Sequence, residues 1–218
     1  MLFTQDEFFN VFAAYNAAIW PLPLFTYLLG VMAVGFSFWQ SRVATVLISA
    51  VLTLMWFVNG VAYHWSFFSE INPLARGFGI LFVVQGLLLI CAPLFWKFYR
   101  IQARRDARTL FGIGLAAFAA FVYPALGWLI GHAYPAVPVF GVAPCPTTIF
   151  TIGILLLGTW KVVRWLLVIP ALWALIGGSA AVLLNVPQDF GLIAAVLVAL
   201  GFAVADARGV QIAHHETS

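Results

Sequence analysis

The sequence contains very few charged residues. Only 8% of its 218 residues are Asp, Glu, Lys or Arg, and 64% are hydrophobic. Because a soluble domain carries roughly 25% charged residues, this composition excludes an ordinary soluble domain and indicates an all-α membrane protein. At this length we expect a single helical bundle. The net charge of +3 does not indicate a nucleic-acid partner, since its distribution along the chain has another explanation, given below.

Cysteine, lysine and buried acidic residues are also scarce, and each absence excludes a class of protein. The two cysteines, Cys91 and Cys145, form no CxxC motif and no disulfide framework. The two lysines, Lys97 and Lys161, lie at the ends of apolar runs, which excludes a retinal protein because its Schiff base needs a buried lysine. No chain of acids runs through the apolar segments, so a proton relay is not indicated. The start, MLFTQDEFFN, is acidic where a cleavable signal peptide is basic.

Long apolar runs fill most of the chain. A membrane-spanning helix needs about 20 apolar residues, within roughly 17–25. Residues 22–206 contain seven such runs, of which the fifth is the shortest, and we predict a bundle of seven transmembrane helices there. The runs cover residues 22–40, 42–63, 75–96, 109–131, 146–162, 164–185 and 188–206.

The basic residues predict how the bundle is oriented. If the N-terminus lies outside, nine of the ten Lys and Arg residues fall on the cytoplasmic side and only Arg76 falls outside. Lys and Arg in short loops stay in the cytoplasm, so we predict an outer N-terminus and a cytoplasmic tail over residues 207–218. The inner residues are Arg42, Lys97, Arg100, Arg104, Arg105, Arg108, Lys161, Arg164 and Arg208.

Residues 1–21 are predicted to form an amphipathic helix that lies at the membrane interface. Thr4 and Glu7 form a capping box, and Phe3 and Phe8 are spaced as its hydrophobic staple. Asn16 is expected on the opposite, polar face. The alternative is an extension of the first spanning helix. The apolar face repeats at helical spacing: Phe8, Phe12, Tyr15 and Ile19.

Polar residues with useful chemistry gather at the predicted outer ends of the helices. His64, His132 and Cys145 are candidate ligands for Zn or Cu, although their spacing matches no known metal motif. The alternative is that both histidines are interfacial residues bonded to backbone carbonyls. A solute or ion path is predicted from outer Glu70, Tyr134 and Asp189 to deeper Asn59 and Gln85.

Cys145 is the most specific of these candidates. The sequence Cys-Pro-Thr-Thr predicts a helix start with Pro146 at the first helical position and Cys145 as the N-cap. The amides of a helix N-terminus favour a thiolate, and a thiol nucleophile also needs a base, for which His132 or His64 are the candidates. The alternative is a small residue in a tight Pro-Cys-Pro turn.

Four stretches resemble a family of uncharacterised bacterial multi-pass membrane proteins, catalogued as a domain of unknown function and sometimes loosely labelled permease. The resemblance implies a bacterial inner-membrane location and covers nearly the whole chain, but it supplies no substrate and no functional residues. The stretches are FAAYNAAIWP, NGVAYHWSFFSEINP, GHAYPAVPVFGVAPCPTTIFTIGILLLG and RWLLVIPALWALIGGSAA.

The sequence favours a transporter or channel for a small solute or metal ion over an enzyme. Its site would open outward and be built from the His, Cys and carboxylate residues named above. One alternative is a membrane-embedded enzyme with a metal or thiol centre at the outer face. Another is a non-catalytic subunit whose partners are the lipid bilayer and a second copy or another protein.

Overall fold

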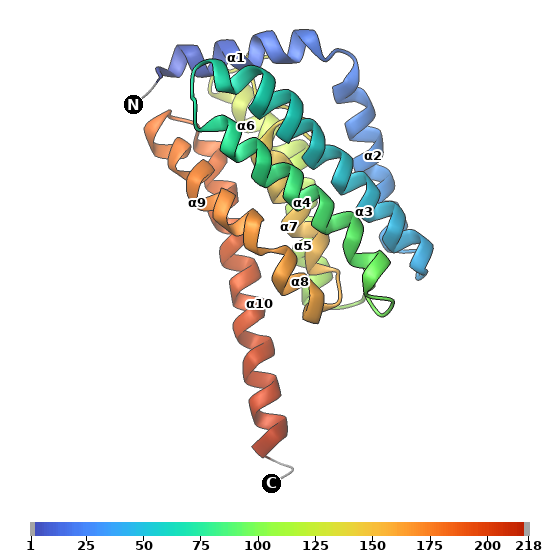
Figure 1. Ribbon diagram of the computed structural model, residues 1–218. Helices are drawn as coiled ribbons and strands as arrows, with labels where there is room; N and C mark the ends of the chain where they lie inside the picture. Colours follow the sequence, from blue (N-terminus) through green and yellow to red (C-terminus); the bar gives the residue numbers. More distant parts are fainter. Residues whose placement is uncertain (1–2, 216–218) are drawn as a thin grey trace.

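The computed structural model describes residues 3–215, with the side chains of residues 3–179 and 181–207, and confirms an all-α fold (Figure 1). Residues 216–218 of the predicted tail lie outside the described residues. The helices are α1 (Gln5–Ala18), α2 (Leu22–Ser37), α3 (Arg42–Phe57), the π-helix η1 (Val58–Phe67), the 3-10 turn η2 (Phe68–Glu70), α4 (Ala75–Phe95), α5 (Ala107–Ala117), the π-helix η3 (Phe118–Val122), α6 (Tyr123–Leu129), α7 (Pro144–Leu156), α8 (Trp160–Leu166), α9 (Val168–Leu183), the 3-10 turn η4 (Pro187–Asp189) and α10 (Phe190–His215).

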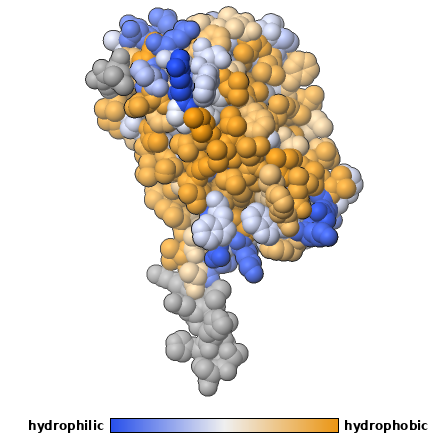
Figure 2. All heavy atoms as spheres, viewed as in Figure 1, coloured by the Kyte–Doolittle hydropathy of each residue, from blue (hydrophilic) through white to orange (hydrophobic). Residues whose placement is uncertain are grey.

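Several of these helices suggest a multi-pass membrane protein. Four continuous helical stretches are long and apolar enough to cross a bilayer, and two bent pairs, α1–α2 and α8–α9, raise the number to as many as six. On the face seen in Figure 2, apolar atoms form a broad middle zone and hydrophilic atoms gather towards its two ends. The four stretches are Arg42–Glu70, Ala75–Phe95, Ala107–Leu129 and Pro187–Ala207.

The predicted fifth span is shorter in the structure than the sequence indicated. Helix α7 has 13 residues and ends at Leu156, whereas the apolar run continues to residue 162. The chain stops being helical there because it pairs with the basic loop: Thr159 N–H donates to Arg100 O, and Gln102 N–H donates to Leu157 O. Nearly every residue of α7 is buried. A helix that is hydrophobic on all sides is typical of the centre of a bundle, and α7 takes this position. The count of seven spans remains a prediction.

Helix α1 lies across one end of the bundle (Figure 1), at 86° to α2. This angle excludes a straight extension of the first span. The capping box of Thr4 and Glu7 is present, and the rings of Phe3 and Phe8 stack with centroids 6.2 Å apart, so both local predictions are confirmed. The predicted apolar face is largely buried, but it packs on the bundle itself.

Asn16 corrects one detail of that prediction. It is fully buried, although the helical spacing placed it on the polar face. Its side-chain amide donates to the backbone oxygens of Pro135 and Val137, at 2.7 and 2.8 Å. Tyr15 adds a third bond, to Val142 O at 2.9 Å. Helix α1 is therefore fastened to the long loop between α6 and α7 through buried polar contacts, which a hydrophobic pattern does not reveal.

Two pairs of glycines allow helices to cross at very short range. A Cβ atom on Gly112 of α5 would lie 2.5 Å from Gly153 O of α7, and a Cβ on Gly153 would lie 2.5 Å from Gly112 O. Gly60 of η1 and Gly79 of α4 have the same reciprocal relation, at 2.9 and 2.8 Å. Close backbone packing through small residues is typical of helix pairs in membranes, where it supplies dispersion contacts.

The N-terminus of α5 depends on an aspartate cap. Asp106 Oδ1 accepts a hydrogen bond from Thr109 N–H at 2.8 Å. That backbone bond lowers the pKa of the Asp106 carboxyl, aided by the Thr109 hydroxyl and by Arg104 and Arg108, while partial burial opposes the shift. A lowered pKa means that the stabilisation is complete above the usual carboxyl range and is lost as the pH falls through the lowered value.

We therefore expect Asp106→Ala to destabilise the protein by about 1 kcal/mol at neutral pH, the usual cost of losing a side-chain N-cap. Thermal unfolding of the purified wild type and variant in detergent checks this from neutral to acid pH. The gap between their midpoints should close as the wild-type carboxylate becomes protonated. A gap that stays constant down to the acid limit would contradict the assigned role of the charge.

Candidate functional site

Two of the predicted site residues, Cys145 and Asp189, line a cavity beneath α1, called here the α1 cavity. It has a volume of about 440 Å³ and lies between α1, η1, the start of α7, α9 and η4. Its walls are mainly aromatic and aliphatic, and a few polar groups interrupt them. Such a combination is typical of sites for small molecules. The polar or partly polar side chains are Tyr63, Asn72, Cys145, Trp173, Ser179 and Asp189.

Asp189 is the only acidic residue among those that line the α1 cavity. It ends the turn η4 and is 1% exposed. Its Oδ1 accepts a hydrogen bond from the Tyr123 hydroxyl at 2.5 Å, and the thiol of Cys145 lies nearby. Cys145, predicted as a metal ligand, and Asp189, predicted as part of a solute path, thus both line the α1 cavity.

Helix α7 begins earlier than the sequence predicted. Ala143 is the N-cap and Pro144 the first helical residue, so Cys145 lies inside the first turn. Both Pro144 and Pro146 suit a helix start, because the first N–H groups of a helix have no intrahelical partner and a proline lacks this group. The backbone N–H of Cys145 is consequently the only amide donor among the first three residues of α7.

The side wall next to Cys145 offers an unused donor. Trp173 of α9 lies close to the Cys145 thiol. Its Nε1 lies 3.1 Å from the position that a Cβ on Gly177 would occupy, and Gly177 also lines the α1 cavity. Within the part of the chain that the structure describes, this buried Nε1 has no hydrogen-bonding partner. A buried donor without a partner costs free energy, so a ligand oxygen would satisfy it.

His64 lies behind the cavity wall and does not line the cavity. It belongs to the π-helix η1 and is fully buried among aromatic rings, with centroids 4.7 Å from Phe82 and 5.0 Å from Trp173. Neither ring nitrogen has a hydrogen-bonding partner among the described residues. The expected bond from His64 to a backbone carbonyl is therefore absent there. π-Helical segments are frequent at functional sites, and the same segment supplies Tyr63 to the cavity.

The structure places His132 with α1. Its ring stacks on Phe9 with centroids 3.8 Å apart, and partial burial lowers the pKa of its imidazole. Among the side chains that the structure describes, in residues 3–179 and 181–207, no group of three or more His, Cys, Asp and Glu is close enough to hold a metal ion. The structure therefore does not bring His64, His132 and Cys145 together as a ligand set, and a Zn or Cu site has no support from this geometry.

Two other predicted residues lie outside the cavity lining. Glu70 is exposed at the end of η2, and Tyr134 is 50% exposed, with its hydroxyl donating to Asn16 O at 3.3 Å. Neither side chain lines the α1 cavity. The two carboxylates that the sequence grouped together, Glu70 and Asp189, thus occupy very different environments.

The deeper residues Asn59 and Gln85 are fully buried in the helical core. The Asn59 amide donates to Met55 O, Gly141 O and Thr147 Oγ1, and the Gln85 amide donates to Leu166 O at 2.9 Å. Both side-chain oxygens lack a partner among the described residues. The same core contains the buried rings of Trp56 and Phe82, whose centroids lie 4.4 Å apart.

Tyr123 and Trp173 were not among the site residues predicted from the sequence. Both stand inside apolar runs, where an aromatic residue is ordinarily a packing residue. For Tyr123, the following Pro124 is a weak local signal, since it marks the irregular junction of η3 with α6. No local signal marks Trp173, because its role arises only from the packing of α9 against α7.

Comparison with known proteins places the chain in a family. Residues 5–214 match the family of unknown function DUF6064, so the chain belongs to that family. This confirms the resemblance to a family of unknown function. No curated protein and no solved structure matches the chain.

Proposed function

We propose that this is a multi-pass membrane protein of transporter type that binds a small, largely apolar solute in the α1 cavity. The solute would carry an amino group or another strong hydrogen-bond donor. The observation that carries this proposal is Asp189, a buried carboxyl group beside an apolar space of about 440 Å³. A buried carboxylate is costly unless it is paired or hydrogen-bonded. Among the described residues its hydrogen-bond partner is the Tyr123 hydroxyl, and the Cys145 thiol and the Tyr63 ring lie nearby.

The proposal includes a bacterial inner-membrane location with the α1 cavity on the outer side. The basic loop 97–108 pairs with the distal end of α7, at Leu157–Thr159, whereas the cavity includes the proximal end of α7, at Cys145. The strong bias of Lys and Arg towards the loop side supports a cytoplasmic position for it. In this arrangement seven helical segments would cross the membrane in alternating directions: α2, α3–η1, α4, α5–η3–α6, α7, α8–α9 and α10. The loop 97–108 would occupy the part of the membrane thickness that the short α7 does not span.

In the proposed carrier, the packed core beside the cavity would close the route from the cavity to the cytoplasm. Alternating access requires that the route to one side is closed while the other is available. Trp56, Phe82 and Leu89 are each at most 1% exposed and fill the bundle towards the loop 97–108. The free oxygens of Asn59 and Gln85 would be the next polar groups that a solute meets when these rings move.

A matched set of ligands tests the binding step. We expect purified protein to bind 2-phenylethylamine more tightly than 2-phenylethanol, and both more tightly than ethylbenzene, as measured by calorimetric titration. Asp189→Asn should weaken amine binding roughly 10- to 100-fold, because a hydrogen bond to a charged group contributes about 1.5–3 kcal/mol. Glu70→Gln is the control, since it removes the same charge at the exposed end of η2. Equal affinity of wild type and Asp189→Asn would contradict the proposal.

A thiol-dependent enzyme is the second candidate, favoured by the approach of Cys145 to Asp189. In that case Asp189, and neither His64 nor His132, would be the group nearest to the nucleophile. The two functions separate on Cys145→Ala, which removes the thiol and keeps the carboxyl group. Retention of amine binding by this variant supports the carrier, whereas thiol-dependent turnover of a bound ester or amide supports the enzyme.

A further inference from the structure

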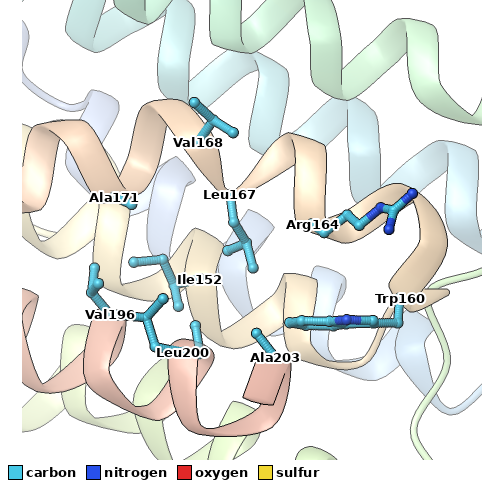
Figure 3. Close-up of a pocket in the computed structure, with 10 residues that line it drawn as sticks. Ile152, Trp160, Arg164, Leu167, Val168, Ala171, Val196, Leu200 and Ala203 are labelled. Atoms are coloured by element: carbon cyan, nitrogen blue, oxygen red, sulfur yellow. The ribbon is translucent and has the colours of Figure 1, made fainter. Parts of the chain in front are cut away.

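A second hollow lies between α8–α9 and α10, towards the other end of α7; it is called here the α10 groove (Figure 3). Its volume is about 220 Å³, and most of its lining is aliphatic, including Ile152 and Val196. Two of its lining residues, Val168 and Leu200, are 53% and 54% exposed, so the groove is open along the surface of the protein. In a membrane-spanning region this surface would face lipid.

One end of the α10 groove carries a positive charge. Arg164 and Trp160 of α8 both line this end (Figure 3). Arg164 is exposed, and its guanidinium lies over the ring of Trp165, 5.3 Å from the ring centroid. Among the side chains that the structure describes, no carboxylate pairs with Arg164. The groove therefore combines an apolar slot with a cation that has no acidic partner there.

A second arginine in the same region, Arg108, is paired within the protein. It pairs with Asp206 at 2.9 Å, and its guanidinium lies 4.9 Å from the ring centroid of Trp160. These contacts join α5, α8 and α10 and hold the Trp160 ring at the end of the groove. Arg108 is thus neutralised within the protein, whereas the charge of Arg164 remains available to a ligand.

We propose that the α10 groove binds an anionic phospholipid, with one acyl chain along the aliphatic lining and the headgroup phosphate on Arg164. A guanidinium binds phosphate oxygens in a bidentate manner. Tryptophan rings favour the level of the headgroups, and anionic lipids attract basic residues at the cytoplasmic leaflet. This site shares no residue with the α1 cavity, so the lipid proposal does not depend on the proposed solute binding.

Native mass spectrometry of the full-length protein tests the headgroup contact. The protein is titrated with phosphatidylglycerol and with phosphatidylcholine of the same acyl chains. We expect tighter binding of phosphatidylglycerol, and a loss of about fivefold in that affinity for Arg164→Gln. Lys161→Gln is the matched control, because it removes one charge from the same helix at a residue that does not line the groove.

A second variant tests the acyl-chain contact. Ala203→Phe should fill the groove and weaken the binding of both lipids, while Arg164 stays in place. An unchanged unfolding midpoint without added lipid shows that this variant keeps its fold. The proposal is overturned if Arg164→Gln binds phosphatidylglycerol as wild type does, if Lys161→Gln weakens it equally, or if the folded Ala203→Phe protein binds both lipids normally.

Discussion

Gly112→Ala is expected to destabilise the protein strongly. The added Cβ would lie 2.5 Å from Gly153 O and would also collide with a Leu157 methyl group. The oxygen belongs to the backbone of the central helix α7, which cannot rotate away as a side chain can, so α5 and α7 would have to separate. Overpacking of this kind costs about 1–3 kcal/mol or more, and 3 kcal/mol corresponds to a fall of roughly 6–12 °C in the unfolding midpoint for a chain of this size.

Gly114→Ala provides the control on the same helix. A Cβ at Gly114 meets no atom within 4 Å. Alanine is also the better helix former by about 0.5–1 kcal/mol, so this variant should be as stable as wild type or slightly more stable. Thermal unfolding of both variants in one detergent measures the difference. Similar midpoints for the two would contradict the close crossing of α5 and α7.

The N-terminal helix was the element best predicted from the sequence. Its capping box and staple involve residues three to five positions apart, and such short-range interactions are visible as spacing. Its buried face followed from the same spacing at Phe8, Phe12 and Tyr15. The partner of that face could not be predicted, because both a membrane interface and the end of a bundle accept an apolar surface. The buried contacts of Asn16 could not be predicted for the same reason, because they depend on the surface against which α1 packs.

The candidate site was predicted only in part, for a geometrical reason. Cys145 and Asp189 were both expected at the outer helix ends, and both line the α1 cavity, because the apolar runs already indicate where those helices begin. Whether His64 and His132 join them depends on how each helix is rotated about its axis. The π-helix η1 turns His64 towards Phe82 and Trp173, and no hydropathy pattern predicts that rotation.

The second large effect is expected at Cys145, whose reactivity reports on the occupancy and the charge of the α1 cavity. The side chain lines the cavity together with Asp189 and lies near its carboxyl group. In a Cys91→Ser protein it is the only thiol. A small methanethiosulfonate reagent with a quaternary ammonium group should react with it faster than one with a sulfonate group, because Asp189 attracts the cation. Asp189→Asn should remove this preference, whereas Glu70→Gln should keep it.

Protection of Cys145 in intact cells is the most direct test that the α1 cavity is a solute site facing outward. If the cavity opens outward, the membrane-impermeant cationic reagent labels the Cys91→Ser protein from outside. With 2-phenylethylamine at ten times its dissociation constant, the rate should fall about tenfold, in proportion to the free site, and Asp189→Asn should lose this protection. Labelling that requires permeabilised cells, or that proceeds at the same rate with and without the amine, would contradict the account.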